Sequence, residues 1–332
     1  MPLDPVDARI VALLAQNGRR SFQSIARELA IPRRLVRNRI QQLTDSRRVK
    51  ICAVVHPRAR GFESAAAFCL NVDISRLEEA TSSLAAFQEI GWVTMVSGRY
   101  DILCGGYFRD DEHISRFVVD KLSKLQSVTR LETFHFLRVI KTSPEHFIIP
   151  RPSDGRNTGS FQLDPIDLAI VTGLGQNAQK TNTEIARSLG MSEGAVRHRI
   201  RRLEERGLIM FAAIVDPRAL GHEIDGSFWM RIELASLLEA ANRLAGFPQV
   251  HFVGITLGRF SLLCRAYFDT KIDLVDFATQ ELPNIPGIQE IEMFHTLRRV
   301  KRTYVPLDEA PVVETGVGEN LRPHLAESSI GR

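Results

Sequence analysis

The sequence predicts an α+β protein of several domains, in which two small helical domains alternate with two βαββαβ sandwich domains. Three observations predict it: a repeat of the whole unit at a spacing of 160 residues, amphipathic helices at the start of each copy, and alternating strand and helix patterns in the rest of each copy. The 332 residues are 44% hydrophobic and 25% charged, as in ordinary globular proteins. This composition excludes collagen, a disordered polymer and a disulfide scaffold.

The repeat keeps one register without a gap. Leu3-Asp4-Pro5-Val6-Asp7 recurs as Leu163-Asp164-Pro165-Ile166-Asp167, Gly98-Arg99 recurs as Gly258-Arg259, and Phe134-His135 recurs as Phe294-His295. A single shift that holds over so many segments indicates a duplicated two-part unit. We expect helical domains at 1–60 and 163–220, sandwich domains at 61–142 and 221–305, a Pro- and Gly-containing linker at 143–162 and a disordered tail at 306–332.

The first of the two helical domains carries most of the positive charge. Residues 1–60 carry 13 Lys and Arg against 4 Asp and Glu, a net charge of +9, whereas residues 161–220 carry 8 against 7, a net charge of +1. A basic module on a mildly acidic body suits contact with a phosphate backbone. A basic face that only contacts solvent remains the alternative from charge alone.

The second copy shows the helical domain most clearly. Thr183 is expected to open a short helix, Gly190 to end it, and Ser192 to cap a third helix. Apolar residues at i, i+4 and i+7 form the buried stripe of that third helix; they are Val196, Ile200 and Leu203. A tight turn between two short helices is typical of a helix-turn-helix, in its plain or winged form. The first copy has Pro32 in place of Ser192, which removes the side-chain cap.

The outward face of each third helix presents residues that can read base edges. These candidate DNA-binding residues are Arg33, Arg34, Arg37, Asn38 and Gln41 in the first copy, and Glu193, Arg197, His198 and Arg201 in the second. Arg can contact a guanine edge and Asn or Gln an adenine edge in the major groove, while Arg19, Arg20, Arg47 and Arg48 could contact phosphates. The alternative is a helical hairpin with solvated arginines. Because the first copy is more basic, the second is expected to bind DNA more weakly.

The second part of each unit predicts strands and helices in the order βαββαβ. After a strand at 51–55, the first copy has strands at 64–74, 92–96, 102–107 and 128–139, and helices at 76–86 and 112–125. The second copy repeats the order. An antiparallel sheet with helices on one face is a ferredoxin-like sandwich.

The best candidate ligand site in these sandwiches is the hairpin between the two middle strands. Gly98 permits a tight turn, and the carboxylate of Asp101 could bind an ammonium group or make a turn hydrogen bond. The second copy has Ser261 at the position of Asp101, which weakens an amine-binding role there. His135 and His295 recur in the last strand, where a histidine is more often packed than ligating.

The sequence contains no pattern typical of a membrane span, a disulfide framework or a metal site. No apolar run approaches the roughly 20 residues that cross a bilayer, so we expect a cytoplasmic protein without a membrane partner. Cys52, Cys69, Cys104 and Cys264 lie far apart and are expected to be reduced, mostly buried thiols. We expect no metal, no cofactor and no catalytic residues.

The residues quoted above resemble the Lrp/AsnC (feast/famine) family of transcriptional regulators, as a tandem duplication in one chain. The resemblance covers nearly all of residues 3–142 and 163–302, and is strongest at Leu163–Asp167 and from Ile185 to Ile209. The hairpin resembles the family's Gly-x-x-Asp element, which lies at the effector pocket between paired domains. The resemblance therefore implies effector-binding residues in both copies, namely Ser97, Gly98, Arg99, Tyr100, Asp101, Gly258, Arg259 and Ser261.

The resemblance implies a regulator that binds a double-stranded DNA operator and responds to a small molecule, usually an amino acid. It also implies that the two effector domains pair within the chain, with further homo-oligomerisation. Pro32 and Ser261 depart from the family pattern, so the halves are expected to differ and to prefer an asymmetric operator. The alternative is an enzyme, because siroheme decarboxylases share this layout; His135 or His251 would then be the general acid or base.

Overall fold

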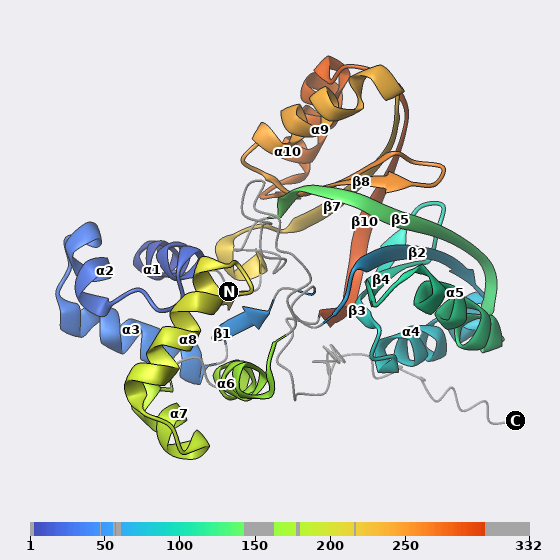
Figure 1. Ribbon diagram of the computed structural model, residues 1–332. Coiled ribbons are helices and arrows are strands. Elements are labelled where there is room, and N and C mark those ends of the chain that lie inside the picture. Colours follow the sequence, from blue (N-terminus) through green and yellow to red (C-terminus); the bar gives the residue numbers. More distant parts are fainter. Residues whose placement is uncertain are drawn as a thin grey trace, which may run out of the picture.

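The computed structural model describes residues 3–46, 48–55, 57, 61–142, 163–176, 180–215 and 217–302. The linker expected at 143–162 and the tail expected at 306–332 lie outside these residues. Figure 1 shows that the helices of the two helical modules, one at the start of each copy, gather on one side of the molecule. The long strands lie on the other side.

The first helical module has three helices, α1 (Pro5–Gln16), α2 (Phe22–Leu29) and α3 (Arg33–Asp45). The Asp4 side chain caps α1 and the Ser21 side chain caps α2. Ala30 adopts a left-handed conformation, with φ of 54°, to turn the chain from α2 into α3. Pro32 precedes α3 and gives it no side-chain cap, as predicted.

The second helical module repeats this arrangement with α6 (Pro165–Gln176), α7 (Asn182–Leu189) and α8 (Glu193–Glu205). Gly190, with φ of 63°, ends α7, and the Ser192 side chain caps α8, as predicted. The expected start of α7 at Thr183 is wrong by one residue. Thr181 and Glu184 form a capping box that satisfies the first turn, so the helix begins at Asn182.

The two helical modules are joined by a two-stranded antiparallel sheet. Strand β1 (Val49–Val55) pairs with β6 (Ile209–Val215), with Cys52 opposite Ala212. Ala213 is buried in the core of the first module and Ala53 in the core of the second, so each strand completes the core of the other copy. The strand expected at 51–55 is therefore present, and it pairs with the equivalent strand of the other copy and not with the sandwich sheets.

The sandwich modules have the predicted order βαββαβ. In the first copy the elements are β2 (Ser64–Val72), α4 (Leu77–Ala86), β3 (Ile90–Ser97), β4 (Ile102–Phe108), α5 (Asp111–Asp120) and β5 (Val128–Thr142). In the second they are β7 (Ile224–Ile232), α9 (Leu237–Gly246), β8 (Val250–Leu257), β9 (Leu262–Phe268), α10 (Lys271–Asp276) and β10 (Ile288–Arg302). Short helical turns flank several of them, at Ile74–Arg76, Leu122–Lys124, Pro217–Leu220, Leu234–Ser236, Phe277–Glu281 and Leu282–Asn284.

The two sandwich sheets do not remain separate. They close into one barrel with the strand order β10-β3-β4-β2-β5-β8-β9-β7, in which β5 pairs with β8 and β10 pairs with β3 across the two copies. Aromatic side chains from both copies fill the barrel, among them Tyr100, Phe134, Trp229, Phe260 and Phe294. The predicted pairing of the effector modules within one chain is therefore present, and the helices cover the outside of each half.

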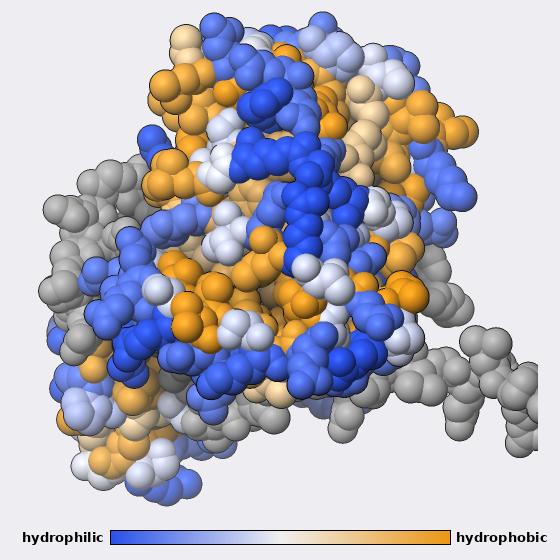
Figure 2. All heavy atoms as spheres, turned by 90° about the vertical axis from the view of Figure 1, so that its right-hand side faces the viewer, coloured by the Kyte–Doolittle hydropathy of each residue, from blue (hydrophilic) through white to orange (hydrophobic). Residues whose placement is uncertain are grey.

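The described surface of the barrel half is mixed in polarity. Figure 2 shows a hydrophilic band that runs between apolar areas on this face of the molecule. None of the described helices is both long and apolar enough to span a bilayer. Within the described residues, three cysteines, Cys69, Cys104 and Cys264, are buried free thiols, and no cluster of His, Cys, Asp and Glu has the size of a metal site.

Candidate DNA-binding face and effector hairpins

The outer face of α3 carries an exposed group of cations. Its buried side consists of Val36, Ile40 and Leu43, the equivalents of the stripe predicted for the second copy, so the opposite side faces solvent. All five predicted DNA-binding residues of this copy are exposed: Arg33, Arg34, Arg37, Asn38 and Gln41. The three arginines make no ion pair with any described residue, whereas Gln41 donates a hydrogen bond to Asp45 at 2.8 Å. The full charge of these guanidinium groups is therefore available to a phosphate or a base edge.

The outer face of α8 carries cations that are already paired. Glu193, Arg197, His198 and Arg201 are all exposed, as predicted. Arg197 lies 2.8 Å from Glu193, and Arg201 lies 3.2 Å from Glu205. Glu193 also accepts a hydrogen bond from Thr183 at 3.0 Å. Exposed pairs of this kind contribute little to stability, but they lower the positive potential that the helix presents to DNA.

In each helical module, acidic side chains at the start of the first helix form ion pairs with the third helix, which carries the candidate DNA-binding residues. In the second copy, Arg199 lies 2.6 Å from Asp164 and 2.7 Å from Asp167, and Arg202 lies 2.5 Å from Asp167. Asp167 is fully buried. The hydrogen bond from Arg199 lowers the pKa of Asp164 below its ordinary value. These ion pairs fix the angle between α6 and α8.

The first copy has a weaker version of the same contact. Arg39 contacts Asp4 and lies 3.4 Å from Asp7. The position of Arg202 is occupied by Gln42, so this copy lacks the equivalent of the Arg202–Asp167 pair, although the charge of Arg48 also lowers the pKa of Asp7. Burial and the nearby Asp4 charge raise the pKa of Asp7, although Arg39 opposes them.

The arginines expected to contact phosphates are not all available. The guanidinium carbon of Arg19 lies 4.1 Å from the centre of the Phe211 ring, and its Nη2 donates to the Lys180 carbonyl at 3.2 Å. Arg20 pairs with Glu28. The fused helix-turn-helix unit thus places the second module against Arg19, and its contact with phosphates stays a prediction. Arg48 is half-buried, and Arg47 lies outside the described residues.

The two predicted hairpins lie at the interface between the sandwich modules. Gly98 has φ of 125° and Gly258 has φ of 146°, which side-chain-bearing residues rarely adopt. A Cβ on Gly98 would lie 3.1 Å from a ring carbon of Phe294, and one on Gly258 would lie 2.6 Å from a ring carbon of Phe134. Each hairpin therefore packs against the long last strand of the other module.

Gly258→Ala is expected to destabilise the protein by about 1 to 3 kcal/mol, because the new methyl group must displace the buried Phe134 ring in addition to straining the backbone. The measurement is the midpoint and slope of urea unfolding followed by circular dichroism. Gly173→Ala is the control, because Gly173 lies in α6 with open space around it and the change should be neutral or stabilising. Equal behaviour of the two variants would contradict the close packing of the hairpin.

Charged residues from both modules meet beside the hairpins. Arg99 lies 3.1 Å from Glu292 and 3.8 Å from Glu132, and Arg259 lies 2.7 Å from Glu292. The buried Tyr100 hydroxyl donates to Glu132, and burial together with this hydrogen bond raises the pKa of Tyr100. The two glutamates come from the last strands of the two modules. The sequence alone did not identify them, because no spacing rule links them to the hairpins.

Asp101 and Ser261 make the same hydrogen bond in the two copies. Asp101 accepts from the backbone N–H of Val72 at 2.9 Å, and Ser261 accepts from that of Ile232 at 3.0 Å. One carboxylate oxygen of Asp101 is therefore used within the hairpin. The turn-stabilising alternative is thus present in the structure, and the amine-binding role of Asp101 stays a prediction.

A small cavity lies at the first hairpin. Ser97 and Gly98 line it together with Ile224, Met293 and Phe294 of the second module, and its volume is about 160 Å³. The strand histidines lie apart from one another: His135 is half-buried near Asp111, with 3.5 Å between Nε2 and Oδ1, and His295 is exposed. His251 is buried.

Comparison with known protein families covers both halves of the chain. An AsnC-type helix-turn-helix domain matches residues 3–44 and the Lrp/AsnC ligand binding domain matches 66–145. A winged helix-turn-helix DNA-binding domain matches 163–210, and the PF0864 C-terminal dimeric alpha+beta barrel domain matches 233–307. Domains of these types, with the exposed basic face of α3, define a DNA-binding transcriptional regulator with ligand-binding domains.

Individual relatives agree with this class. The HTH-type transcriptional regulator Ptr1 of Methanocaldococcus jannaschii is 33% identical over 140 residues, which are 42% of this chain and 95% of the relative. The leucine-responsive regulatory protein of Rhizobium meliloti is 28% identical over 144 residues, or 42% of this chain and 92% of the relative. The chain belongs to the Lrp/AsnC family of transcriptional regulators and carries the unit twice.

Solved structures of another protein match most of the chain. The siroheme decarboxylase NirDL has a TM-score of 0.63 with 15% sequence identity, over 90% of this chain and 93% of the other. At this identity the likeness extends to the fold alone. It shows that a tandem arrangement of this kind also occurs in an enzyme.

Proposed function

We propose that the chain reads an asymmetric operator in double-stranded DNA, with α3 making the stronger contact and α8 the weaker one. The observation that carries the proposal is the unequal pairing of the two faces: Arg37 has no ion-pair partner among the described residues, whereas its equivalent Arg197 is paired with Glu193. The fused helix-turn-helix unit holds the two helices in one assembly. Half-sites separated by roughly 34 to 36 Å would let both helices contact one face of the DNA.

We assign a function to each domain within the limits predicted from the sequence. Residues 1–60 and 163–220 are assigned to DNA binding, and 61–142 and 221–305 to effector binding and assembly. Relatives that regulate transcription and are similar over one whole unit support this assignment. A transcriptional regulator must reach the DNA that it binds, so we propose that the protein is located in the cytoplasm.

The experiment that tests operator binding compares DNA from upstream of the chain's own gene with unrelated DNA of equal length across a salt series. We expect a preference of roughly a thousandfold and a steep loss of affinity with salt, because neutralised phosphates release counterions. A footprint should show two unequal half-sites. Two identical inverted half-sites, or equal weak binding to both fragments, would contradict the proposal.

We propose further that an amino acid or another small-molecule effector binds at the hairpins, and that the chain regulates rather than catalyses. The name of the Rhizobium relative refers to leucine. The hairpins read Gly98-Arg99-Tyr100-Asp101 and Gly258-Arg259-Phe260-Ser261, without a histidine for acid-base chemistry. Turnover of siroheme by the purified chain would contradict this part of the proposal and favour the decarboxylase alternative.

Asp101→Asn separates the two roles of the hairpin carboxylate. The asparagine oxygen can still accept the hydrogen bond from Val72, but its side chain has no charge to bind an ammonium group. We expect unchanged thermal stability and at least a tenfold weaker response of operator binding to an amino-acid panel. Ser261→Ala removes the equivalent hydrogen bond in the second copy, where there is no carboxylate, and should reduce the response less than Asp101→Asn does. A normal response in Asp101→Asn would assign Asp101 a structural role only.

Further association of these chains is part of the proposal. The barrel half exposes apolar side chains in both copies, including Leu137 on β5 and its equivalent Leu297 on β10. Exposed apolar areas of this kind favour contact with another protein surface (Figure 2). Light scattering at several protein concentrations measures whether the chain assembles beyond one copy.

A further inference from the structure

The cavity at the first hairpin has an apolar floor and a polar opening. Among the residues that line it, Ile224, Phe228 and Phe294 are buried. Ser97 and His295 are exposed and lie at its opening. The hairpin thus covers a hollow that belongs mostly to β7 and β10 of the second module. We call this hollow the seam pocket, and the rest of its lining is Gly98, Gly226, Ser227, Leu274 and Met293.

The seam pocket favours an uncharged group of limited size. None of the described residues that line it is Asp, Glu, Lys or Arg. An ionised side chain of a ligand would therefore be buried there without a counter-charge, which costs free energy. The volume of about 160 Å³ has room for about six apolar heavy atoms, because a cavity of similar volume binds benzene. An aliphatic or thioether side chain fits this space, whereas an indole ring is too large.

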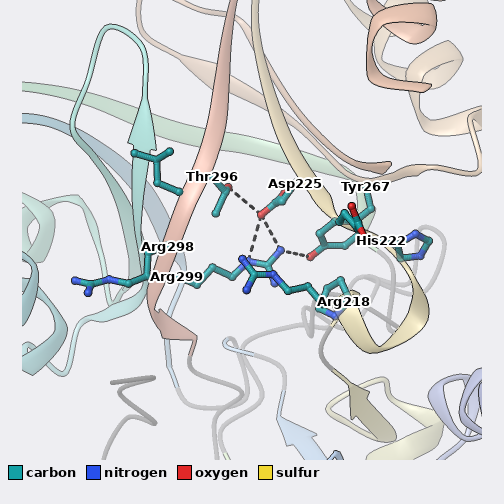
Figure 3. A pocket seen from close by; sticks show the side chains of 10 residues that line it. Arg218, His222, Asp225, Tyr267, Thr296, Arg298 and Arg299 are labelled. Atoms are coloured by element: carbon teal, nitrogen blue, oxygen red, sulfur yellow. Dashed lines mark hydrogen bonds and ion pairs between the residues drawn. The ribbon is translucent and has the colours of Figure 1, made fainter. Parts of the chain in front are cut away.

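Strands β7 and β10 are linked beside the seam pocket by a buried carboxylate. Asp225 lies between two lining residues of β7, and Thr296 follows the lining residue His295 of β10. The Oδ2 of Asp225 accepts hydrogen bonds from Thr296 at 3.0 Å and from Arg299 at 2.7 Å (Figure 3). The first module has Ala65 at the position of Asp225 and cannot form this link. Walls that are already fixed lose less freedom when a ligand binds.

The equivalent location at the second hairpin is polar where the seam pocket is apolar. Ser64 of β2 occupies the position of Ile224. Its hydroxyl donates a hydrogen bond to Asp111 at 2.7 Å. The Nε2 of His135 lies 3.5 Å from the same carboxylate oxygen of Asp111. An apolar group at this location would take water away from these three polar side chains, which is unfavourable.

The two locations have the same strand pairing, so they differ in their side chains. His135 lies opposite Leu257 just as His295 lies opposite Ser97. The second hairpin thus has a larger, apolar side chain where the first has a hydroxyl at the opening of the seam pocket. A ligand that needs an apolar floor and a polar opening finds both at the first hairpin.

We propose that each chain binds a single amino acid with an apolar side chain, that this ligand occupies the seam pocket, and that the equivalent location at the second hairpin stays empty. The side chain of the ligand packs on Ile224, Phe228 and Phe294. Its charged head group lies at the opening, beside Ser97 and His295. This inference rests on the proposed effector role of the hairpins and adds which hairpin binds, what kind of ligand it takes and how many molecules bind.

The test is equilibrium dialysis of the full chain against radiolabelled L-leucine and L-methionine, with L-aspartate, L-lysine and L-tryptophan as comparisons. We expect leucine or methionine to saturate at one molecule per chain, with a dissociation constant below about 1 mM and at least tenfold tighter than any comparison. Two molecules bound per chain, or tighter binding of a comparison, would overturn this inference and leave the effector role of the hairpins in place. Absence of binding by all five would contradict both.

Two pairs of reciprocal exchanges locate the ligand, all at exposed positions where the core is not disturbed. Ser97→Leu should weaken binding at least tenfold, because the larger side chain covers the opening, whereas Leu257→Ser should leave binding unchanged. Met293→Thr should weaken binding by about three- to tenfold through lost apolar contact, whereas Thr133→Met should not change it. Equal effects within either pair would place the ligand outside the seam pocket and overturn the inference.

Discussion

Arg37→Gln is expected to weaken operator binding by about 10- to 100-fold, whereas the equivalent Arg197→Gln should weaken it by less than about threefold. Arg37 is exposed on α3 without an ion-pair partner among the described residues, so its charge is available to DNA. Arg197 lies 2.8 Å from Glu193 on the same helix face, and contact with DNA must first break that pair. The change removes the same charge in each copy, so the comparison isolates the local environment.

Fluorescence anisotropy with a labelled operator fragment measures this difference, and repeating it across a salt series reveals the kind of contact. A lower salt slope in Arg37→Gln would indicate a phosphate contact, and an unchanged slope with relaxed sequence preference would indicate a base contact. Glu193→Gln tests the opposite change. It removes the ion-pair partner of Arg197 and should strengthen the binding of α8 to DNA. Equal losses of operator affinity for Arg37→Gln and Arg197→Gln would contradict the proposal that the two helices bind DNA unequally.

Asp167→Asn is expected to destabilise the helix-turn-helix unit by about 2 to 4 kcal/mol, because it removes the buried partner of two arginines. Asp167 is fully buried and lies 2.7 Å from Arg199 and 2.5 Å from Arg202. Asp7→Asn, at the equivalent position of the first copy, should cost less than about 1 kcal/mol, because Arg39 lies 3.4 Å away and burial already disfavours the ionised form. Urea unfolding of the two variants measures the difference.

The pH dependence of Asp7→Asn provides the matching check. The folded-state pKa of Asp7 is raised, so its contribution to stability is fully present below the unfolded-state pKa and is lost as pH rises through the folded value. The wild type should therefore lose stability relative to Asp7→Asn across that pH interval. A constant difference between the two proteins across it, or equal costs for both asparagine variants, would contradict this account.

Much of the local structure follows from the sequence because it depends on neighbours in the chain. Gly190 ends α7 because a left-handed residue is needed there, and Ser192 caps α8 because its hydroxyl reaches the N–H of Ala195. The stripe of Val196, Ile200 and Leu203 is buried as its spacing predicted. The repeat at 160 residues likewise predicts two similar sandwiches and lets the charges of the two recognition helices be compared position by position.

The candidate sites were only partly predictable. The exposed recognition residues and the hairpin glycines could be identified from spacing and turn chemistry. Glu132 and Glu292 could not, because they reach the hairpins from last strands that pair across the two copies. The buried ion pairs of Asp225 with Arg265 and Arg299 had one available signal: the second copy has charged residues where the first has Ala65 and Gly105.

The sequence by itself determined the duplicated unit, its helices and strands, its family and the asymmetry of charge, because each follows from local spacing or from direct comparison of the copies. Only the tertiary structure decided that the two sheets close into one barrel, that β1 pairs with β6, and that Arg19 of the first module packs on Phe211 of the second. Those outcomes depend on which distant apolar faces bury one another. Several pairings satisfy the same alternation of side chains, and the packed core selects among them.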